Sequence, residues 1–269
     1  MSDFTAIITA PFFIRALIGG LAAAWLTATL GVHVVMRRNS LFGEAISHAA
    51  LAGVALGLWL QIDPLATTLL VAVLVGVTLP YIEKNRRLPL DNWLGSLLPT
   101  AMGLGVILLA LRPGYQPDLV SYLFGSILTI SQIKLYWLLG LAAVTLWLTY
   151  RYRQGLLLVS FDETLAKVSG APVRRLQILF NVLLAIAVTA GIQVVGAVLV
   201  NTLLIVPAAI VRLWASNTRQ MFRWTPLVAS LLVVGGLLIS AAANIPSGPT
   251  VAVLGGIILL LSNWLRPSV

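Results

Sequence analysis

An acid and a histidine stand four residues apart in a long apolar stretch of this chain. Glu44 and His48 belong to the segment NSLFGEAISHAALAGVALGLWL. Residues at i and i+4 are neighbours on one face of a helix, so a carboxylate oxygen and an imidazole nitrogen would lie close together. These donors suit a divalent transition metal or a relayed proton. Each ionisable side chain in a spanning helix costs about 2.5–3.5 kcal/mol on insertion scales, so two on one face suggest a use. The residues alone leave open the alternative of an intrahelical hydrogen bond that satisfies both groups.

The composition indicates that this pair lies in an integral membrane protein. The 269 residues are 59% hydrophobic and only 9% charged, and the mean hydropathy is +1.00. Soluble domains are about 45–50% apolar and about 25% charged. A helix that crosses a bilayer needs about 20 apolar residues, so there is room for about eight to ten spans and for no soluble domain. We therefore expect an all-α, polytopic helical membrane protein with one transmembrane domain over residues 1–269.

Apolar segments alternate with breaks that contain proline, glycine or charged residues. The nine expected spans cover residues 12–36, 42–61, 64–83, 92–111, 131–150, 173–191, 194–212, 225–243 and 249–265. The pair that meets around Gly191–Gly196 could also be one broken helix or a re-entrant turn. The stretch 112–130 is expected to lie as a short helix along the outer surface.

The basic residues predict the orientation of the chain. With the N-terminus outside and the C-terminus inside, all 17 lysines and arginines except Arg15, Arg112 and Lys134 fall at inner loops. This distribution follows the positive-inside rule and requires an odd number of spans. The net charge of +9 is therefore explained by membrane topology, and it does not indicate binding of nucleic acid.

The longest inner loop, residues 155–172, predicts a short amphipathic helix. Ser160 and Glu163 have the spacing of a capping box. Gly170 stands where a C-terminal glycine cap would be, and Pro172 prevents continuation. Such a short helix is not stable alone in water, so it needs a surface to lie on. The spacing alone leaves open whether this is the membrane, the protein's own bundle or a cytoplasmic partner.

The sequence lacks the common motifs of nucleotide-binding proteins and of hydrolases. None of Lys84, Lys134 and Lys167 lies in a G-x-x-x-x-G-K-[ST] run, so ATP would have to be hydrolysed by another protein. The sequence contains no H-E-x-x-H, no G-x-S-x-G and no cysteine. With only two histidines, a metallohydrolase would lack ligands, and we expect no enzyme activity in this chain itself.

Weaker candidates lie elsewhere in the apolar segments. Asn201 and Thr202 precede Pro207, so one helix combines polar groups with a proline bend. This helix could line a translocation path, or its polar groups could bond between helices. His33 stands alone and is expected to be a packing residue. The small residues Ala49, Gly53 and Gly57 are typical of close helix packing, either within one chain or in a dimer.

Five stretches carry a resemblance to a known family. The chain resembles the permease subunits of the ABC importers that take up zinc, manganese or iron, nearly from end to end. The stretches are RRNSLFGEAISHAALAGVALG at 37–57, SYLFGSIL at 121–128, SFDETLAKVSGAPV at 160–173, VGAVLVNTLLIVPAAIV at 195–211 and PSGPTVAV at 246–253. The resemblance implies the fold of a type II ABC importer permease.

The resemblance also implies roles for particular residues. Glu44 and His48 match the acid-x-x-x-His pair of the family's translocation path, with Glu where Asp is usual. Asn244 stands near a position where some relatives carry an acid, and Leu98-Pro99 where some zinc members have a histidine. The 160–171 helix corresponds to the coupling helix that docks on the ATPase; its candidate residues are Phe161, Asp162, Glu163, Leu165, Ala166 and Gly170.

By this resemblance the chain is expected to be one permease of a homodimer in the bacterial inner membrane. Its partners would be an ATP-binding cassette ATPase and an extracytoplasmic metal-binding protein. The cargo would be a divalent metal ion, zinc or manganese rather than iron, with ATP used by the partner and no cofactor bound permanently. Two alternatives are a related ABC permease for a metal chelate or a vitamin, and a stand-alone proton-coupled transporter.

Overall fold

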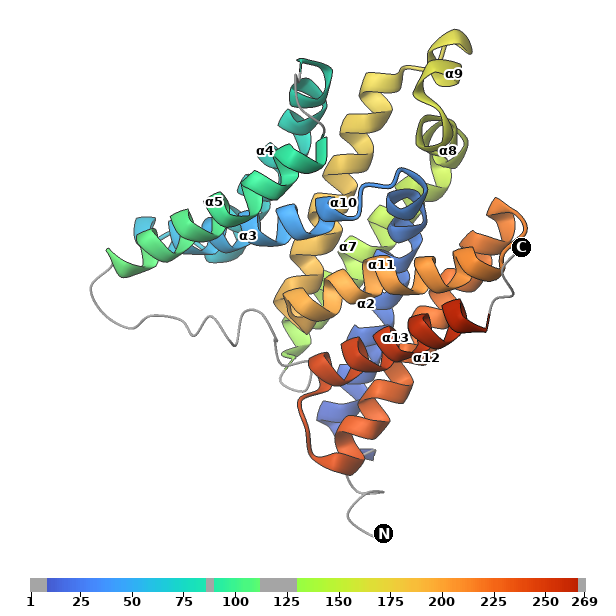
Figure 1. Cartoon of the computed structure of the whole chain (residues 1–269). Coiled ribbons are helices and arrows are strands. Elements are labelled where there is room, and N and C mark those ends of the chain that lie inside the picture. Colours follow the sequence, from blue (N-terminus) through green and yellow to red (C-terminus); the bar gives the residue numbers. More distant parts are fainter. Residues whose placement is uncertain (1–8, 86–89, 112–129, 266–269) are drawn as a thin grey trace. The chain divides into compact units, whose positions relative to one another are not determined.

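The computed structural model of the chain describes residues 9–85, 90–111 and 130–265, and these residues form helices without strands (Figure 1). Nine helices in this part of the chain are long and apolar enough to cross a membrane, as the sequence predicts. They are α2 (Pro11–Met36), α3 (Leu41–Leu60), α4 (Pro64–Asn85), α5 (Leu90–Ala110), α7 (Gln132–Arg151), α10 (Val173–Val195), α11 (Ala197–Trp214), α12 (Thr218–Ala243) and α13 (Ser247–Trp264). The surface helix expected at 112–130 lies outside the described residues, apart from Ile130.

The predicted break near Gly191 is displaced in the structure. Gly191 continues α10, and the chain instead turns at Gly196, whose φ of 87° is the left-handed conformation that glycine tolerates best. Gly191 is small for a different reason. A β-carbon there would lie 2.7 Å from a methyl group of Val200 in α11. Two separate helices therefore meet here, each long and apolar enough to cross a membrane, as the expected spans predict rather than one broken helix.

The helix expected from residue 225 begins earlier, at Thr218. Asn217 caps it, because its side-chain oxygen accepts a hydrogen bond from the backbone N–H of Gln220 at 2.9 Å. Pro226 lies inside α12 without ending it. The basic residues Arg219 and Arg223, which predicted a loop, instead stand exposed on the first turns of the helix.

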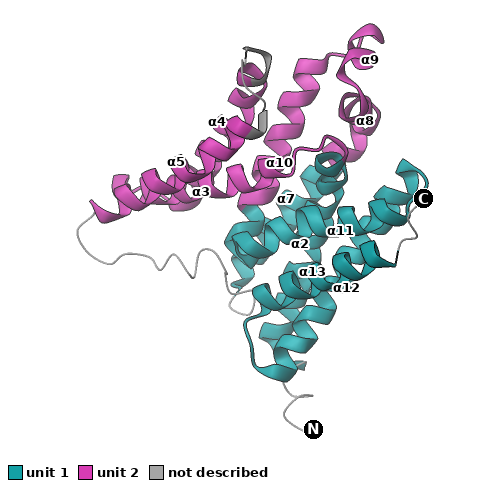
Figure 2. Cartoon of the chain, viewed as in Figure 1, with its two compact units in different colours: residues 1–35, 119–146, 190–269 teal, residues 36–118, 147–189 magenta. Residues whose placement is uncertain are grey.

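The chain divides into two compact units (Figure 2). Unit 1 comprises residues 1–35, 119–146 and 190–269, and in it α11, α12 and α13 pack pairwise. The N-terminal helix α2 is held against this group. Gly31 meets the backbone of Leu204 in α11, and the indole of Trp25 donates a hydrogen bond to Ser230 in α12 at 3.1 Å. His33 is fully buried, 5.1 Å between ring centroids from Phe222, which agrees with a packing role.

Unit 2 comprises residues 36–118 and 147–189 and carries both candidate sites. In it α3 packs against α4 and α5, and α4 packs against α10, where a β-carbon at Gly76 would lie 2.9 Å from the carbonyl oxygen of Asn181. The small-residue stripe of α3 serves this packing within one chain. A β-carbon at Gly53 would lie 2.7 Å from the Cα of Thr68, and one at Gly57 would lie 2.9 Å from the Cα of Pro64.

Replacing Gly53 by alanine is expected to destabilise the protein, because the added methyl group would have to displace the backbone of α4. Overpacking of this kind costs about 1–3 kcal/mol. We expect the purified protein in detergent to unfold at a lower temperature than the wild type, followed by tryptophan fluorescence. Gly103→Ala in α5 is the matched control, since a β-carbon at Gly103 meets no described atom within 4 Å. Equal midpoints for the two variants would contradict the tight contact.

Candidate functional site

Glu44 and His48 lie on a single half-exposed stripe of α3. The stripe consists of Leu41, Glu44, His48 and Ala52, while the residues between them, such as Ala45 and Ser47, are buried. Helical geometry places Glu44 on the face of α3 about opposite Gly53, which packs on α4. The two positions are nine residues apart, and nine steps of about 100° make two and a half turns. The packing that fixes α3 therefore leaves the acid and the histidine accessible.

The start of α3 favours a negative charge at Glu44. This residue stands in the first turn of the helix, where the partial positive charge of the macrodipole is concentrated. Ser40 at the N-cap position makes no side-chain capping bond. An anion near a helix N-terminus gains about 0.3–1 kcal/mol at exposed sites and more when partly buried, which offsets part of the cost of a carboxylate in an apolar segment.

The two side chains are not paired with each other in the structure. Among the described residues no hydrogen bond or ion pair joins Glu44 to His48 or to another side chain, so the intrahelical hydrogen bond is not formed here. The described part of the chain also holds no group of three or more metal-ligating side chains. One carboxylate and one imidazole can bind a divalent transition metal, but most of its coordination positions would stay open to water or to a second protein.

Helix α5 contacts α3 at Ala52, the end of the stripe, one turn beyond His48. A β-carbon at Gly105 would lie 3.4 Å from the backbone nitrogen of Ala52, and α5 runs in the same direction as α3 (Figure 1). Counting back along the two helices brings Leu98 about level with Glu44. At this level α5 has Leu98 and Pro99, neither of which can bind a metal.

The three weaker path residues belong to unit 1, and the structure shows a local structural role for Thr202 and Asn244. Thr202 donates its hydroxyl hydrogen to the carbonyl oxygen of Val198 at 2.8 Å, while Asn201 is half-buried one residue earlier. Asn244 is exposed at the C-terminus of α12, where its φ of 54° ends the helix in the left-handed conformation, a conformation that asparagine adopts readily. A role of these three residues in translocation stays a prediction.

The inner segment predicted as one helix forms two short helices, α8 (Arg153–Phe161) and α9 (Glu163–Val168). The residue that caps α9 is Asp162, not Ser160 as the capping-box spacing predicted. One carboxylate oxygen of Asp162 accepts hydrogen bonds from the backbone N–H groups of Thr164 and Leu165, at 2.7 and 3.1 Å. Ser160 belongs to α8 and is buried; its hydroxyl donates to the carbonyl oxygen of Leu156. The sequence did contain a signal for this cap, because Asp162 is as good an N-cap residue as serine.

The C-terminus of α9 agrees with the prediction. Gly170 has a φ of 74°, and the backbone N–H of Ala171 bonds the carbonyl oxygen of Ala166 at 3.0 Å, as in a Schellman motif. Ala166 is fully buried, and α9 packs against α8. An ion pair of 2.6 Å joins Glu163 to Lys167 along the helix.

Three apolar side chains at the end of α8 and on α9 are exposed. Phe161 is 70% exposed, Leu165 54% and Val168 82%. Leu165 and Val168 stand three residues apart on one face of α9, and Phe161 ends α8 just before it. These three residues are here called the 161–168 knob, and nothing in the described part of the chain covers them. Exposed apolar groups gathered in this way are typical of a contact with another molecule.

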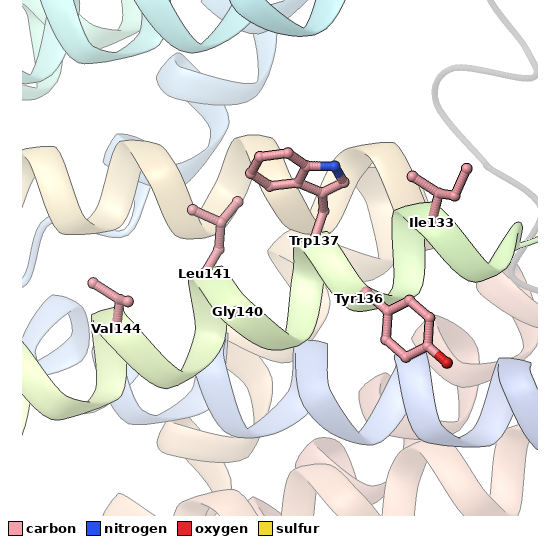
Figure 3. A pocket seen from close by; sticks show the side chains of 6 residues that line it. All are labelled: Ile133, Tyr136, Trp137, Gly140, Leu141 and Val144. Carbon is pink, nitrogen blue, oxygen red and sulfur yellow. The ribbon is translucent and has the colours of Figure 1, made fainter.

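A shallow pocket on α7 has a different character. Its lining comprises Ile133, Tyr136, Trp137, Gly140, Leu141 and Val144. Figure 3 shows Trp137, Leu141 and Val144 projecting from one side of the helix, with the ring of Tyr136 directed to the other side. This lining has no carboxylate and no imidazole, so it suits lipid chains or an apolar helix rather than a metal ion. At the opposite end of α7, the guanidinium carbon of Arg153 lies 4.7 Å from the ring centroid of Tyr150. Both residues are exposed, and tyrosine is enriched at membrane interfaces.

Comparisons with known proteins connect these features. Residues 9–266 match a family described as ABC-3: ABC 3 transport family. The chain is 32% identical to the high-affinity zinc uptake system membrane protein ZnuB of Haemophilus influenzae, over 93% of this chain and 96% of that protein. It is 26% identical to the manganese transport system membrane protein MntC of Halalkalibacterium halodurans, over 98% and 90%. A chain of PsaBC from Streptococcus pneumoniae, solved in complex with a Fab, matches with a TM-score of 0.86 and 30% identity, over 99% of this chain and 96% of that one.

Removing the cap of α9 is expected to loosen the knob. Asp162→Ala deletes the acceptor of two backbone N–H groups, and loss of such a cap costs about 0.5–2 kcal/mol, more than a six-residue helix can spare. The backbone amides of Thr164 and Leu165, which lose this acceptor, should then exchange with deuterium faster, measured by mass spectrometry on the purified protein. Asp162→Asn keeps the acceptor and should exchange like the wild type. Unchanged exchange in Asp162→Ala would show that the cap does not support α9.

Proposed function

Because the chain belongs to the ABC 3 transport family, we propose that it is the permease of an ATP-driven importer of a divalent transition metal ion. The observation that carries this proposal is the accessible, unneutralised pair of Glu44 and His48 on one stripe of α3. A permease for a vitamin or a large chelate would have no use for an oxygen and a nitrogen donor at this spacing.

A two-ligand site suits transport better than storage. A path that moves ions must bind them well enough to admit them and weakly enough to release them. Glu44 and His48 would replace part of the hydration shell of the ion and leave the other positions to water. In a homodimer the pair would occur twice around the axis, and two copies would complete the coordination of one ion.

We propose zinc or manganese as the cargo. Carboxylate and imidazole ligands accept both metals, and the similar proteins are named for zinc uptake in one case and for manganese transport in another. Glu44 has one methylene more than the aspartate usual in the family, and Leu98 offers no third ligand. Both features support selection of the metal by an extracytoplasmic binding protein rather than by this site.

The energy would come from a separate ATPase subunit that receives the 161–168 knob. The exposed side chains of Phe161, Leu165 and Val168 would fill an apolar groove on that subunit, with Glu163 at the rim. The capped and closed ends of α9 keep the knob rigid. The remaining predicted coupling residues, Ala166 and Gly170, would shape the knob instead of touching the partner. ATP binding would then move α8 and α9 and switch the access of the metal site.

This assignment places the knob on the cytoplasmic side of the inner membrane. The N-terminus would lie outside and the C-terminus inside, as the distribution of the basic residues predicts.

Metal uptake is expected to depend on both members of the α3 pair. In cells that lack their own zinc and manganese importers and express this permease with its partners, Glu44→Gln and His48→Ala should each lower uptake of radioactive zinc or manganese at least about tenfold, comparable to the loss of an important group near a metal. Glu44→Asp keeps the carboxylate and should retain part of the uptake.

The control for this experiment is Ser47→Ala, which changes a buried neighbour on another face of α3. All variants are compared at equal protein levels in the membrane. Uptake at the wild-type rate in both Glu44→Gln and His48→Ala would remove the site from the transport path.

Association with the ATPase is expected to depend on the knob. Leu165→Ala and Phe161→Ala remove exposed apolar groups without opening a cavity in this chain. Truncation of a hot-spot residue at the centre of an interface costs about 2 kcal/mol or more of binding free energy. Each variant should therefore retain much less ATPase during purification in detergent. Thr164→Ala, also exposed on α9, is the matched control and should retain the wild-type amount.

A contrary result would favour a different mechanism. If the purified chain alone moved protons or metal across vesicles under a proton gradient, it would be a secondary transporter and the knob would have another partner.

A further inference from the structure

A buried contact ties the turn before α3 to the end of α8. The Nε of Arg37 donates a hydrogen bond to the hydroxyl oxygen of Ser160 at 3.1 Å, across 123 positions of the sequence. The guanidinium carbon of Arg37 also lies 4.4 Å from the ring centroid of Phe180 in α10. Ser160 and Phe180 are buried, and Arg37 is half-buried. One arginine thus joins three segments of unit 2.

Each end of this contact leads directly to one of the two candidate sites. Ser160 precedes Asp162, the cap of α9, by two residues. Arg37 precedes the first residue of α3 by four, and the turn between them is tight, with Arg38 at a φ of 56° and a hydrogen bond from the N–H of Phe42 to the carbonyl oxygen of Asn39. Glu44 stands in the first turn of that helix.

The chemistry of arginine makes this contact resistant to small movements. A guanidinium group stays charged, hydrogen-bonds in a fixed plane and stacks on aromatic rings. When it is partly removed from water, both the charged hydrogen bond and the contact with the ring become stronger. A displacement of α8 would therefore move the α2–α3 turn with it rather than break the contact.

We propose that Arg37 is the positioning residue through which the coupling segment controls the metal pair on α3. This inference rests on the proposed function and adds to it a physical link between its two sites. When α9 follows the ATPase, Ser160 moves Arg37, and Arg37 reorients the first turns of α3 and with them Glu44 and His48. Energetic coupling of this kind requires a continuous set of packed and hydrogen-bonded groups, and these residues supply one.

The test uses the complete complex of permease and ATPase in lipid vesicles. It measures the number of ATP molecules hydrolysed for each zinc or manganese ion accumulated. Arg37→Gln and Ser160→Ala should raise this ratio about fivefold or more, the lower range of measured allosteric couplings, while ATP hydrolysis continues. Combining both substitutions should add little, because they break the same contact.

Two controls isolate the contact. Arg38→Asn removes the adjacent exposed charge and keeps a residue that tolerates a positive φ. Thr29→Ala removes a hydroxyl bond to the residue four positions earlier, as Ser160→Ala also does. Both should keep the wild-type ratio. If Arg37→Gln does not fold, Ser160→Ala decides the result.

A second measurement separates positioning from a purely structural role. In the wild-type complex, a non-hydrolysable ATP analogue should shift the zinc affinity. In Ser160→Ala this shift should disappear, while the affinity without nucleotide stays unchanged. A wild-type ratio and a wild-type shift in both Arg37→Gln and Ser160→Ala would overturn the inference. If the wild-type complex accumulated neither zinc nor manganese, the proposed function itself would fail.

Discussion

The organisation of unit 2 depends on how an ionisable pair is kept in an apolar helix without being neutralised. Two features of α3 achieve this. The helix start provides a partial positive charge beside Glu44, and the glycines at 53 and 57 hold the opposite face of α3 against α4. The acid and the histidine therefore remain accessible on the face that α4 does not cover. A bulkier residue on the glycine face would move the helix and the pair together.

Much of the fold could be predicted from the sequence because lipid simplifies the problem. In a bilayer every backbone polar group must be satisfied within the structure, so an apolar run of sufficient length is a helix. All nine expected spans are present among the described residues. The i, i+4 spacing likewise placed Glu44 and His48 on one face. Local chemistry also located Gly170, because few residues other than glycine accept its positive φ.

The errors concern choices between similar residues and contacts between distant ones. Ser160 and Asp162 are both good N-caps, and only the three-dimensional structure shows that Ser160 is occupied inside α8. From the sequence, Gly191 and Gly196 could each end a helix. In the structure Gly191 is needed because it packs against Val200, and Gly196 is needed because its backbone has a positive φ. The contact of Arg37 with Ser160 spans 123 positions and leaves no periodic signal. From the sequence, Arg37 counted only as a charge of an inner loop and as part of the 37–57 stretch that resembles the family.

The central claim is that the transported ion is bound by the pair on α3. Pulsed electron paramagnetic resonance of Mn²⁺ bound to the purified permease–ATPase complex tests it directly, because a coordinating imidazole nitrogen modulates the manganese signal. The account predicts nitrogen modulation in the wild type and its loss in His48→Asn. Manganese bound without a nitrogen ligand, or modulation that persists in His48→Asn, would contradict the account.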